Sequence, residues 1–353
     1  MNRLAWFEYA DAARRMQGRA LEWIGLGPRE SPFQIVQTGP GYRLRRYSDG
    51  ADHRPPLLIV PAPIKRPYIW DLCPQRSVVR RAIAHGLRVY LVEWMAPDAA
   101  TYRCGLADYA GPMLDACIAG IGLDCGAGRT ILAAHSLGGI VAALHSAYRP
   151  EQVAALVLVD APLHFPGADG RTLTREAAGT VRVPGSYLSM SAACAAPRAF
   201  YRDRYLDHLA SLGSPEHLAT HWRVERWAMD ELPMTPALFR DVVEQMVARD
   251  SFMRGAIAMG GRALHPRAIT APLLSVVTQD SVIAPADAVR TFHDCVGSSE
   301  KCLLTYSGDV GVALQHVGAL VGERAGRDIW PRVFAWLDTL PPTSGSEHIQ
   351  PAE

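Results

Sequence analysis

The sequence predicts an α/β protein with a mostly parallel central sheet, because short apolar strands alternate with helices over residues 57–159 and 272–340. Between these stretches, residues 163–265 are rich in helix formers, aromatic residues and proline breaks, without a convincing parallel strand. We therefore expect one sheet domain with helices on both faces, interrupted by a helical insertion that forms a cap.

The expected boundaries follow from this alternation. Strands are expected at 33–38, 42–47, 57–61, 88–93, 130–134, 153–159, 272–278 and 301–306, and helices at 4–24, 77–85, 106–121, 137–148, 286–295 and 327–340. The predicted organisation is an N-terminal helical extension (1–32), the first part of the sheet domain (33–162), the cap (163–265), the second part of the sheet domain (266–340) and a disordered tail (341–353).

The bulk composition argues against partners that are recognised by charge. The 353 residues include 36 basic and 35 acidic side chains, so the net charge is +1. This balance provides no strong field for nucleic acid or a membrane surface. No apolar run reaches the roughly 18 residues of a membrane span, and the first 30 residues carry charges where a signal peptide would be apolar.

The cysteines indicate a reducing compartment. There are seven, an odd number, without paired C-x-x-C spacing. A secreted disulfide framework and a zinc site are both disfavoured by this pattern. The sequence also lacks a glycine-rich phosphate loop and a flavin motif. We expect a cytoplasmic protein without a metal or cofactor.

One segment carries a specific chemical signal. Residues 130–139 read TILAAHSLGG, which predicts a buried strand, a sharp turn and a helix. A nucleophile elbow needs small residues two before and two after the nucleophile, and Ala134 and Gly138 occupy these positions around Ser136. Ala134 is a mild departure from the usual G-x-S-x-G. The turn would aim the N–H of Leu137 at a developing oxyanion.

A serine nucleophile requires a base, and the base requires an acid that orients it. In folds with such an elbow the acid and then the histidine follow the serine along the chain, each after a strand. His316 follows the last strand and is the expected base. Asp160 and Asp280 both follow strands and both fit as the acid. We interpret His135, beside the elbow, as a packing or solvated residue.

With these residues in place, the chain resembles the polyhydroxyalkanoate synthases of the α/β-hydrolase superfamily, in particular the short catalytic subunits of two-component synthases. The likeness runs from about residue 33 to 340. It is carried by residues 59–72, 77–80, 89–94, 97–98, 106–117, 226–227, 239–240, 260–261 and 316–337. The resemblance implies Asp280 as the acid, because Ile283, Ala284 and Pro285 follow it as in that family.

The resemblance also bears on the second oxyanion donor. Pro61 and Pro63 have no backbone N–H, so the donor in this loop must be Ala62 or Ile64. The family pattern implies Ile64. Three departures from the family stand out: Ser136 replaces a cysteine nucleophile, Ser281 replaces a histidine after the acid, and the loop at 307–315 is longer.

The serine changes the expected chemistry. A cysteine acyl-enzyme is a thioester that can pass its acyl group to another hydroxyl, whereas an acyl-serine is a lower-energy oxoester suited to hydrolysis. We expect a serine hydrolase or acyltransferase that acts on 3-hydroxyacyl esters, oligoesters or thioesters. Polymerisation of 3-hydroxyacyl-CoA and a non-catalytic granule-binding role are the alternatives. A granule surface, a second synthase-type subunit or a homodimer is left open as partner. Six methionines and two tryptophans in 163–265 suit an acyl pocket under the cap, or ordinary cap packing.

Overall fold

The computed structural model describes residues 5–48, 54–167 and 182–340, so the predicted tail lies outside it. Eight strands form one sheet in the order β1-β2-β6-β3-β7-β8-β11-β12. The strands are β1 (Gln34–Gly39), β2 (Tyr42–Arg46), β3 (Leu57–Val60), β6 (Val89–Trp94), β7 (Thr130–His135), β8 (Val153–Val159), β11 (Leu273–Thr278) and β12 (Lys301–Tyr306). From β6 to β12 all neighbours are parallel, whereas β1 and β2 pair antiparallel at one edge. The predicted fold class is confirmed.

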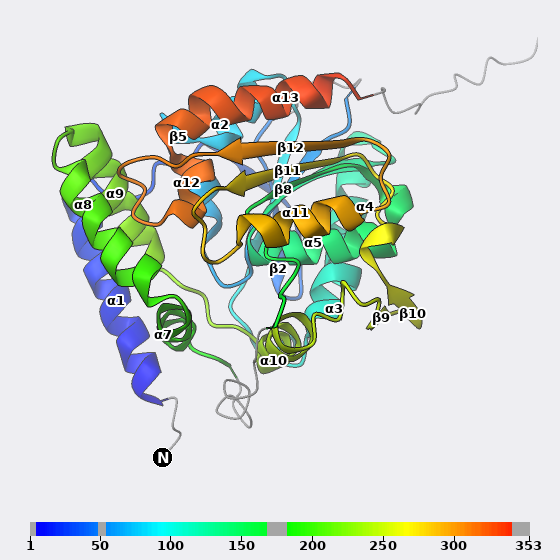
Figure 1. Cartoon of the computed structure of the whole chain (residues 1–353), viewed down its shortest axis with the longest axis horizontal. Helices are drawn as coiled ribbons and strands as arrows, with labels where there is room; N and C mark the ends of the chain where they lie inside the picture. The colour runs from blue at the N-terminus through cyan, green and yellow to red at the C-terminus, as the bar shows by residue number, and fades with distance from the viewer. Residues whose placement is uncertain (1–4, 49–53, 168–181, 341–353) are drawn as a thin grey trace, which may run out of the picture.

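Both faces of the sheet are covered by helices (Figure 1). The helices α2 (Val78–Ala84), α12 (Gln315–Val321) and α13 (Trp330–Asp338) cover one face, and α4 (Leu114–Cys125), α5 (Leu137–Tyr148) and α11 (Ala286–Cys295) cover the other. Strand β3 shows why this is required. Leu58 and Val60 pack into the core with α4 and α5, whereas Leu57 and Ile59 pack into the core with α2 and α13. Successive residues of a strand point to opposite faces, so an all-apolar strand needs cover on both.

A helical cap lies between β8 and β11. It contains α7 (Gly185–Ala195), η4 (Arg198–Asp203), α8 (Arg204–Ser211), α9 (Pro215–Ala228), α10 (Pro236–Asp241), η5 (Val242–Ala248) and the antiparallel pair β9 (Ile257–Met259) and β10 (Arg262–Leu264). The N-terminal helix α1 (Ala5–Trp23) packs along α7 and α9 (Figure 1). Asp11 of α1 accepts hydrogen bonds from the N–H groups of Gly185 (3.1 Å) and Ser186 (2.7 Å), so α1 caps the first turn of α7.

The remaining elements are short. They are η1 (Pro67–Trp70), β4 (Asp71–Cys73), β5 (Arg76–Ser77), α3 (Leu106–Asp108), η2 (Tyr109–Met113), η3 (Pro150–Gln152), η6 (Pro266–Ala268) and η7 (Ala325–Ile329). The single helix expected at 106–121 therefore runs as α3, η2 and α4, with a π-helical turn around Pro112. Proline lacks the N–H of a regular helix, which accounts for the altered turn. Within the described ranges, no helix has both the length and the apolar composition of a bilayer crossing.

The order of the sheet also fixes where a site forms. Strand β3 pairs with β6 on one side and β7 on the other, so the chain reverses its direction of winding at β3. In open α/β sheets, ligands bind beside the carboxyl ends of the strands at such a reversal. The turn after β7 and the loop after β3 meet at this point, and both belong to the expected site.

Candidate active site

Ser136 lies on a strained turn between β7 and α5. Its φ is 55°, a region that residues other than glycine rarely adopt. A Cβ on Gly138 would lie 2.2 Å from the carbonyl oxygen of Val60, so only glycine lets α5 approach β3 this closely. Ala134 is fully buried. The local geometry is that of a nucleophile elbow, with the serine at the carboxyl edge of the sheet.

His316 faces the serine. Its Nε2 lies 2.9 Å from the hydroxyl oxygen of Ser136, across 180 residues of sequence. The sequence analysis placed His316 after the last strand; the structure places it as the second residue of α12, whose next residues are all buried. Burial, with the neighbouring His135, lowers the pKa of His316 well below its ordinary value. The ring is therefore neutral near pH 7 and can accept the serine proton.

His135 supports His316, a role that the sequence analysis missed. Its Nε2 donates to the backbone carbonyl of His316 over 2.7 Å, and the ring centroids lie 4.6 Å apart. Burial lowers the pKa of His135 to about 4, so this ring also stays neutral. The only signal in the sequence was its position directly before the nucleophile, which is equally compatible with packing.

The structure does not bring Asp280 to His316. Asp280 is exposed and makes no described hydrogen bond or ion pair, whereas the hydroxyl of Ser281 lies 3.4 Å from Nδ1 of His316. The tight turn after β11, closed by the bond from Ser281 N–H to the carbonyl of Thr278, directs Ser281 inward and Asp280 outward. The described conformation therefore differs from the expected Ser-His-Asp triad, in which Asp280 would contact His316.

The other candidate acid is engaged elsewhere. Asp160 is fully buried and accepts hydrogen bonds from the backbone N–H (2.7 Å) and the hydroxyl of Thr278. Burial raises its pKa to about 7. Asp160 thus joins the carboxyl ends of β8 and β11, and no described bond links it to His316.

The two expected oxyanion donors lie in the segments that flank the serine: Leu137 follows Ser136 directly, and Ile64 belongs to the loop after β3. The N–H of Leu137 is the first of α5 and has no acceptor inside the helix. Ile64 lines the cavity beside Ser136, and no acceptor for its N–H occurs among the described residues. Its carbonyl accepts from Leu232 N–H (3.0 Å), which ties this loop to the segment after α9.

A cavity of about 420 Å³ opens above the serine, beneath α1, α7 and α9. Its apolar wall includes Trp70, Leu188, Met190, Phe200 and Val317. Its volume suits a small organic molecule. In the part of the chain that the structure describes, no cluster of histidine, cysteine or carboxylate side chains could hold a metal ion.

The chain is similar in sequence to curated polymerase subunits. It is 26% identical over 322 residues to the poly(3-hydroxyalkanoate) polymerase subunit PhaC of Allochromatium vinosum, covering 87% of this chain and 88% of that protein. It is 28% identical over 331 residues to the corresponding subunit of Synechocystis, covering 89% and 85%. No family model matches the chain.

Solved structures share the fold. A hydrolase from Pseudomonas aeruginosa has a TM-score of 0.55 at 16% identity, and covers 88% of this chain and 99% of its own. A thermophilic esterase from Thermogutta terrifontis has a TM-score of 0.55 at 18% identity, with the same coverage. A thioesterase domain from the curacin biosynthetic pathway has a TM-score of 0.51 at 11% identity, and covers 88% and 100%.

The sequence relatives and the solved structures of the same fold lead to one conclusion. Poly(3-hydroxyalkanoate) polymerase subunits align over most of the chain, and hydrolases and esterases share its architecture. The chain is therefore a polyhydroxyalkanoate synthase-like enzyme with the α/β-hydrolase fold.

Proposed function

We propose that this enzyme transfers acyl groups through Ser136, with His316 as general base. The observation that carries the proposal is the 2.9 Å contact between Ser136 Oγ and His316 Nε2 at the elbow. The serine oxygen attacks the acyl carbon while its proton passes to His316. The leaving alcohol or thiol then takes that proton, and an acyl-serine remains. The N–H groups of Leu137 and Ile64 stabilise the oxyanion.

The orienting acid in this proposal is Asp280, brought inward by a rearrangement of the turn after β11. In the described conformation only a hydroxyl at 3.4 Å faces His316 Nδ1. A hydroxyl does not offset the charge of a buried imidazolium as a carboxylate does. Asp280 is the neighbouring residue and has no competing partner among the described residues, whereas Asp160 accepts hydrogen bonds from Thr278.

The favoured reaction is hydrolysis of 3-hydroxyacyl esters, oligoesters or thioesters. An acyl-serine is an oxoester, and water is its thermodynamically favoured acceptor. Transfer to the hydroxyl of a growing chain, with 3-hydroxyacyl-CoA as donor, is the second candidate. It is favoured by the likeness to polymerase subunits over 87% of this chain. Granule binding, a second subunit, a homodimer and a cytoplasmic location stay predictions.

One experiment separates these reactions. The purified wild type and Ser136→Cys are each incubated with 3-hydroxybutyryl-CoA and with short nitrophenyl esters, and CoA release is followed alongside mass spectrometry of the products. We expect free acid from the wild type. The cysteine variant should hydrolyse esters more slowly and transfer the acyl group to hydroxyl acceptors, because its thioester keeps the energy of the donor. Polymer from the wild type, at a rate that Ser136→Cys does not exceed, would favour polymerisation.

A further inference from the structure

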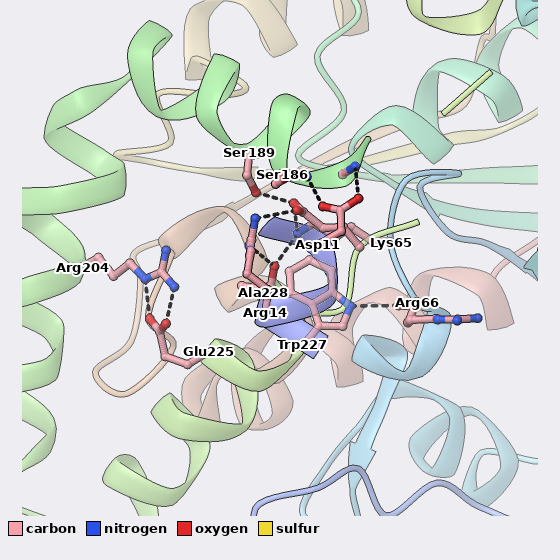
Figure 2. Close-up of polar contacts among 12 residues, drawn as sticks. Asp11, Arg14, Lys65, Arg66, Ser186, Ser189, Arg204, Glu225, Trp227 and Ala228 are labelled. Atoms are coloured by element: carbon pink, nitrogen blue, oxygen red, sulfur yellow. Dashed lines mark hydrogen bonds and ion pairs between the residues drawn. The ribbon is translucent and has the colours of Figure 1, made fainter. Parts of the chain in front are cut away.

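Two cations share one carboxylate in the wall of the catalytic cavity (Figure 2). The guanidinium of Arg14, from α1, donates to Glu231 over 2.8 Å and to the carbonyl of Ala228 over 2.7 Å. The ammonium of Lys65, from the oxyanion loop, donates to the same carboxylate over 2.6 Å and to the same carbonyl over 3.1 Å. The hydroxyl of Ser189 also donates to Glu231.

This cluster sets two basic side chains against one carboxylate, and burial lowers the pKa of Lys65 while Glu231 opposes that shift. The neighbouring pair differs, because in the same cavity wall Arg204 donates two hydrogen bonds to a carboxylate of its own, Glu225 (Figure 2). Arg66, also in the wall, lies 3.6 Å from Asp230. The excess of basic groups over carboxylates in this wall therefore lies at Arg14 and Lys65. A charge without a counter-ion in a partly buried site is costly, and a bound anion would offset that cost.

All three side chains line the cavity, and the two basic ones are more exposed than the carboxylate. The side chains of Arg14 and Lys65 are 25% and 17% exposed, whereas that of Glu231 is 6% exposed. Glu231 already accepts hydrogen bonds from three donors, so its oxygens are engaged within the cluster. Both cations keep N–H groups beyond those used for Glu231 and Ala228. A ligand in the cavity would thus meet donors at this end and apolar side chains elsewhere.

We propose that Arg14 and Lys65 form a subsite for a carboxylate carried by the acyl part of the substrate, a proposal that rests on the function given above. The substrate class is then esters or thioesters of acids with a second, free carboxylate. The phosphates of coenzyme A are the other anions to consider. They are separated from the thioester by the whole pantetheine arm, and a cavity of about 420 Å³ does not hold that arm together with the nucleotide.

The test compares anionic with neutral esters of equal chain length. The mono-4-nitrophenyl esters of adipate and suberate are compared with the hexanoate and octanoate esters, and the readout is the ratio of their kcat/KM values. We expect the wild type to favour the anionic ester about tenfold, the effect of a hydrogen bond to a charged group. Arg14→Gln and Lys65→Met should each abolish this preference.

Glu231→Gln is the most informative variant, because the subsite predicts that it changes the ratio of kcat/KM values in the opposite direction to Arg14→Gln. It removes the competing negative charge and should increase the preference for the anionic ester, whereas a purely structural cluster would lower both rates in every variant. Arg15→Gln is the matched control, because Arg15 is the exposed neighbour of Arg14 on α1 and does not line the cavity. Its ratio should equal that of the wild type. A wild-type ratio of one, or the same direction of change in Glu231→Gln and Arg14→Gln, would overturn the subsite.

A binding measurement separates this outcome from failure of the proposed function. Monomethyl adipate is titrated calorimetrically into Ser136→Ala, with and without Arg14→Gln. Binding that requires Arg14 supports the subsite even if no ester is turned over, and an absence of binding contradicts it. Ester turnover without any preference for an anion would leave the function standing and remove the subsite. Competition by coenzyme A that disappears in Arg14→Gln would place a phosphate there and overturn the assignment to the acyl group.

Discussion

The two ring nitrogens of His316 have unequal partners. Nε2 lies 2.9 Å from the hydroxyl of Ser136, whereas Nδ1 faces the hydroxyl of Ser281 at 3.4 Å. During proton transfer the buried ring must become an imidazolium. The described conformation offers the ring no carboxylate, and burial and His135 both oppose its protonation. The proposed inward turn of Asp280 supplies the missing charge.

Substitution of the two candidate acids tests this assignment. We expect Asp280→Asn to lower kcat/KM by up to about 10⁴-fold, because the imidazolium loses its counter-ion and the ring its fixed tautomer. Asp160→Asn should change kcat/KM by less than about tenfold, since Asp160 bonds to Thr278 and not to the base. Steady-state kinetics on a nitrophenyl ester give both values. The reverse ranking would assign the role of the acid to Asp160, which follows β8. Loss of activity in Ser281→Ala, with Asp280→Asn unaffected, would show that the described turn is the working one.

At the scale of elements, the close approach of β3 and α5 places the nucleophile. The two elements meet at Gly138, where an added Cβ would lie 2.2 Å from the carbonyl oxygen of Val60 and 2.7 Å from the carbonyl carbon of Pro61. Both are backbone atoms, so the helix itself would have to move. That movement would also displace the N–H of Leu137 from the oxyanion.

We therefore predict that Gly138→Ala lowers the free energy of unfolding by about 3 kcal/mol, the upper part of the usual range for overpacking. Activity should fall by more than the loss of folded protein explains. Chemical denaturation and nitrophenyl ester kinetics measure the two effects. Gly128→Ala is the control, because a Cβ there meets no atom within 4 Å. Equal behaviour of the two variants would contradict the close packing of the elbow.

The elements that the sequence predicted best are those whose pattern is local. The bounds of α5, α11, β8 and β12 agree with the expected ranges, because buried parallel strands are apolar runs and the helices carry periodic apolar positions. Helix α12 was not predicted. It is short, follows a glycine-containing loop and consists almost entirely of buried residues, so packing and not local propensity stabilises it.

In the site, too, some features could be predicted from the sequence and others depend on the folded structure. The order of elements along the chain was sufficient to pair Ser136 with His316, since both follow parallel strands whose carboxyl ends share one edge. The choice between Asp280 and Ser281 depends on which of two adjacent side chains a tight turn directs inward, and a turn sequence does not specify that. The Arg14 and Lys65 cluster joins α1 to the loop after β3, and no spacing along the chain predicts a contact of that kind.

At the scale of the whole molecule, the buried titratable groups make stability depend on pH. The pKa of Asp160 is raised to about 7 by burial, above its ordinary value of 3.8. The folded state therefore binds a proton that the unfolded state releases as pH rises from about 4 to 7. Asp160 is neutral in the folded protein at the acid end of this window, and its charged form lowers stability at the alkaline end.

We predict that the free energy of unfolding of Asp160→Asn, minus that of the wild type, increases as pH rises from 4 to 8. His135, whose pKa is lowered to about 4, has the opposite effect and destabilises both proteins equally as pH falls below 6.5. The difference between the melting temperatures of the two proteins therefore reports the contribution of Asp160 alone. A difference that stays constant over this range would show that Asp160 has an ordinary pKa.

Acylation of Ser136 is the claim on which the rest of the account depends, and covalent labelling tests it most directly. The protein is treated with a fluorophosphonate, digested, and mapped by mass spectrometry. We predict one adduct, on the peptide that contains Ser136, absent in Ser136→Ala and formed at least about a hundredfold more slowly in His316→Ala, because the hydroxyl then lacks its base. An adduct on another residue, or undiminished labelling of Ser136→Ala, would contradict the account.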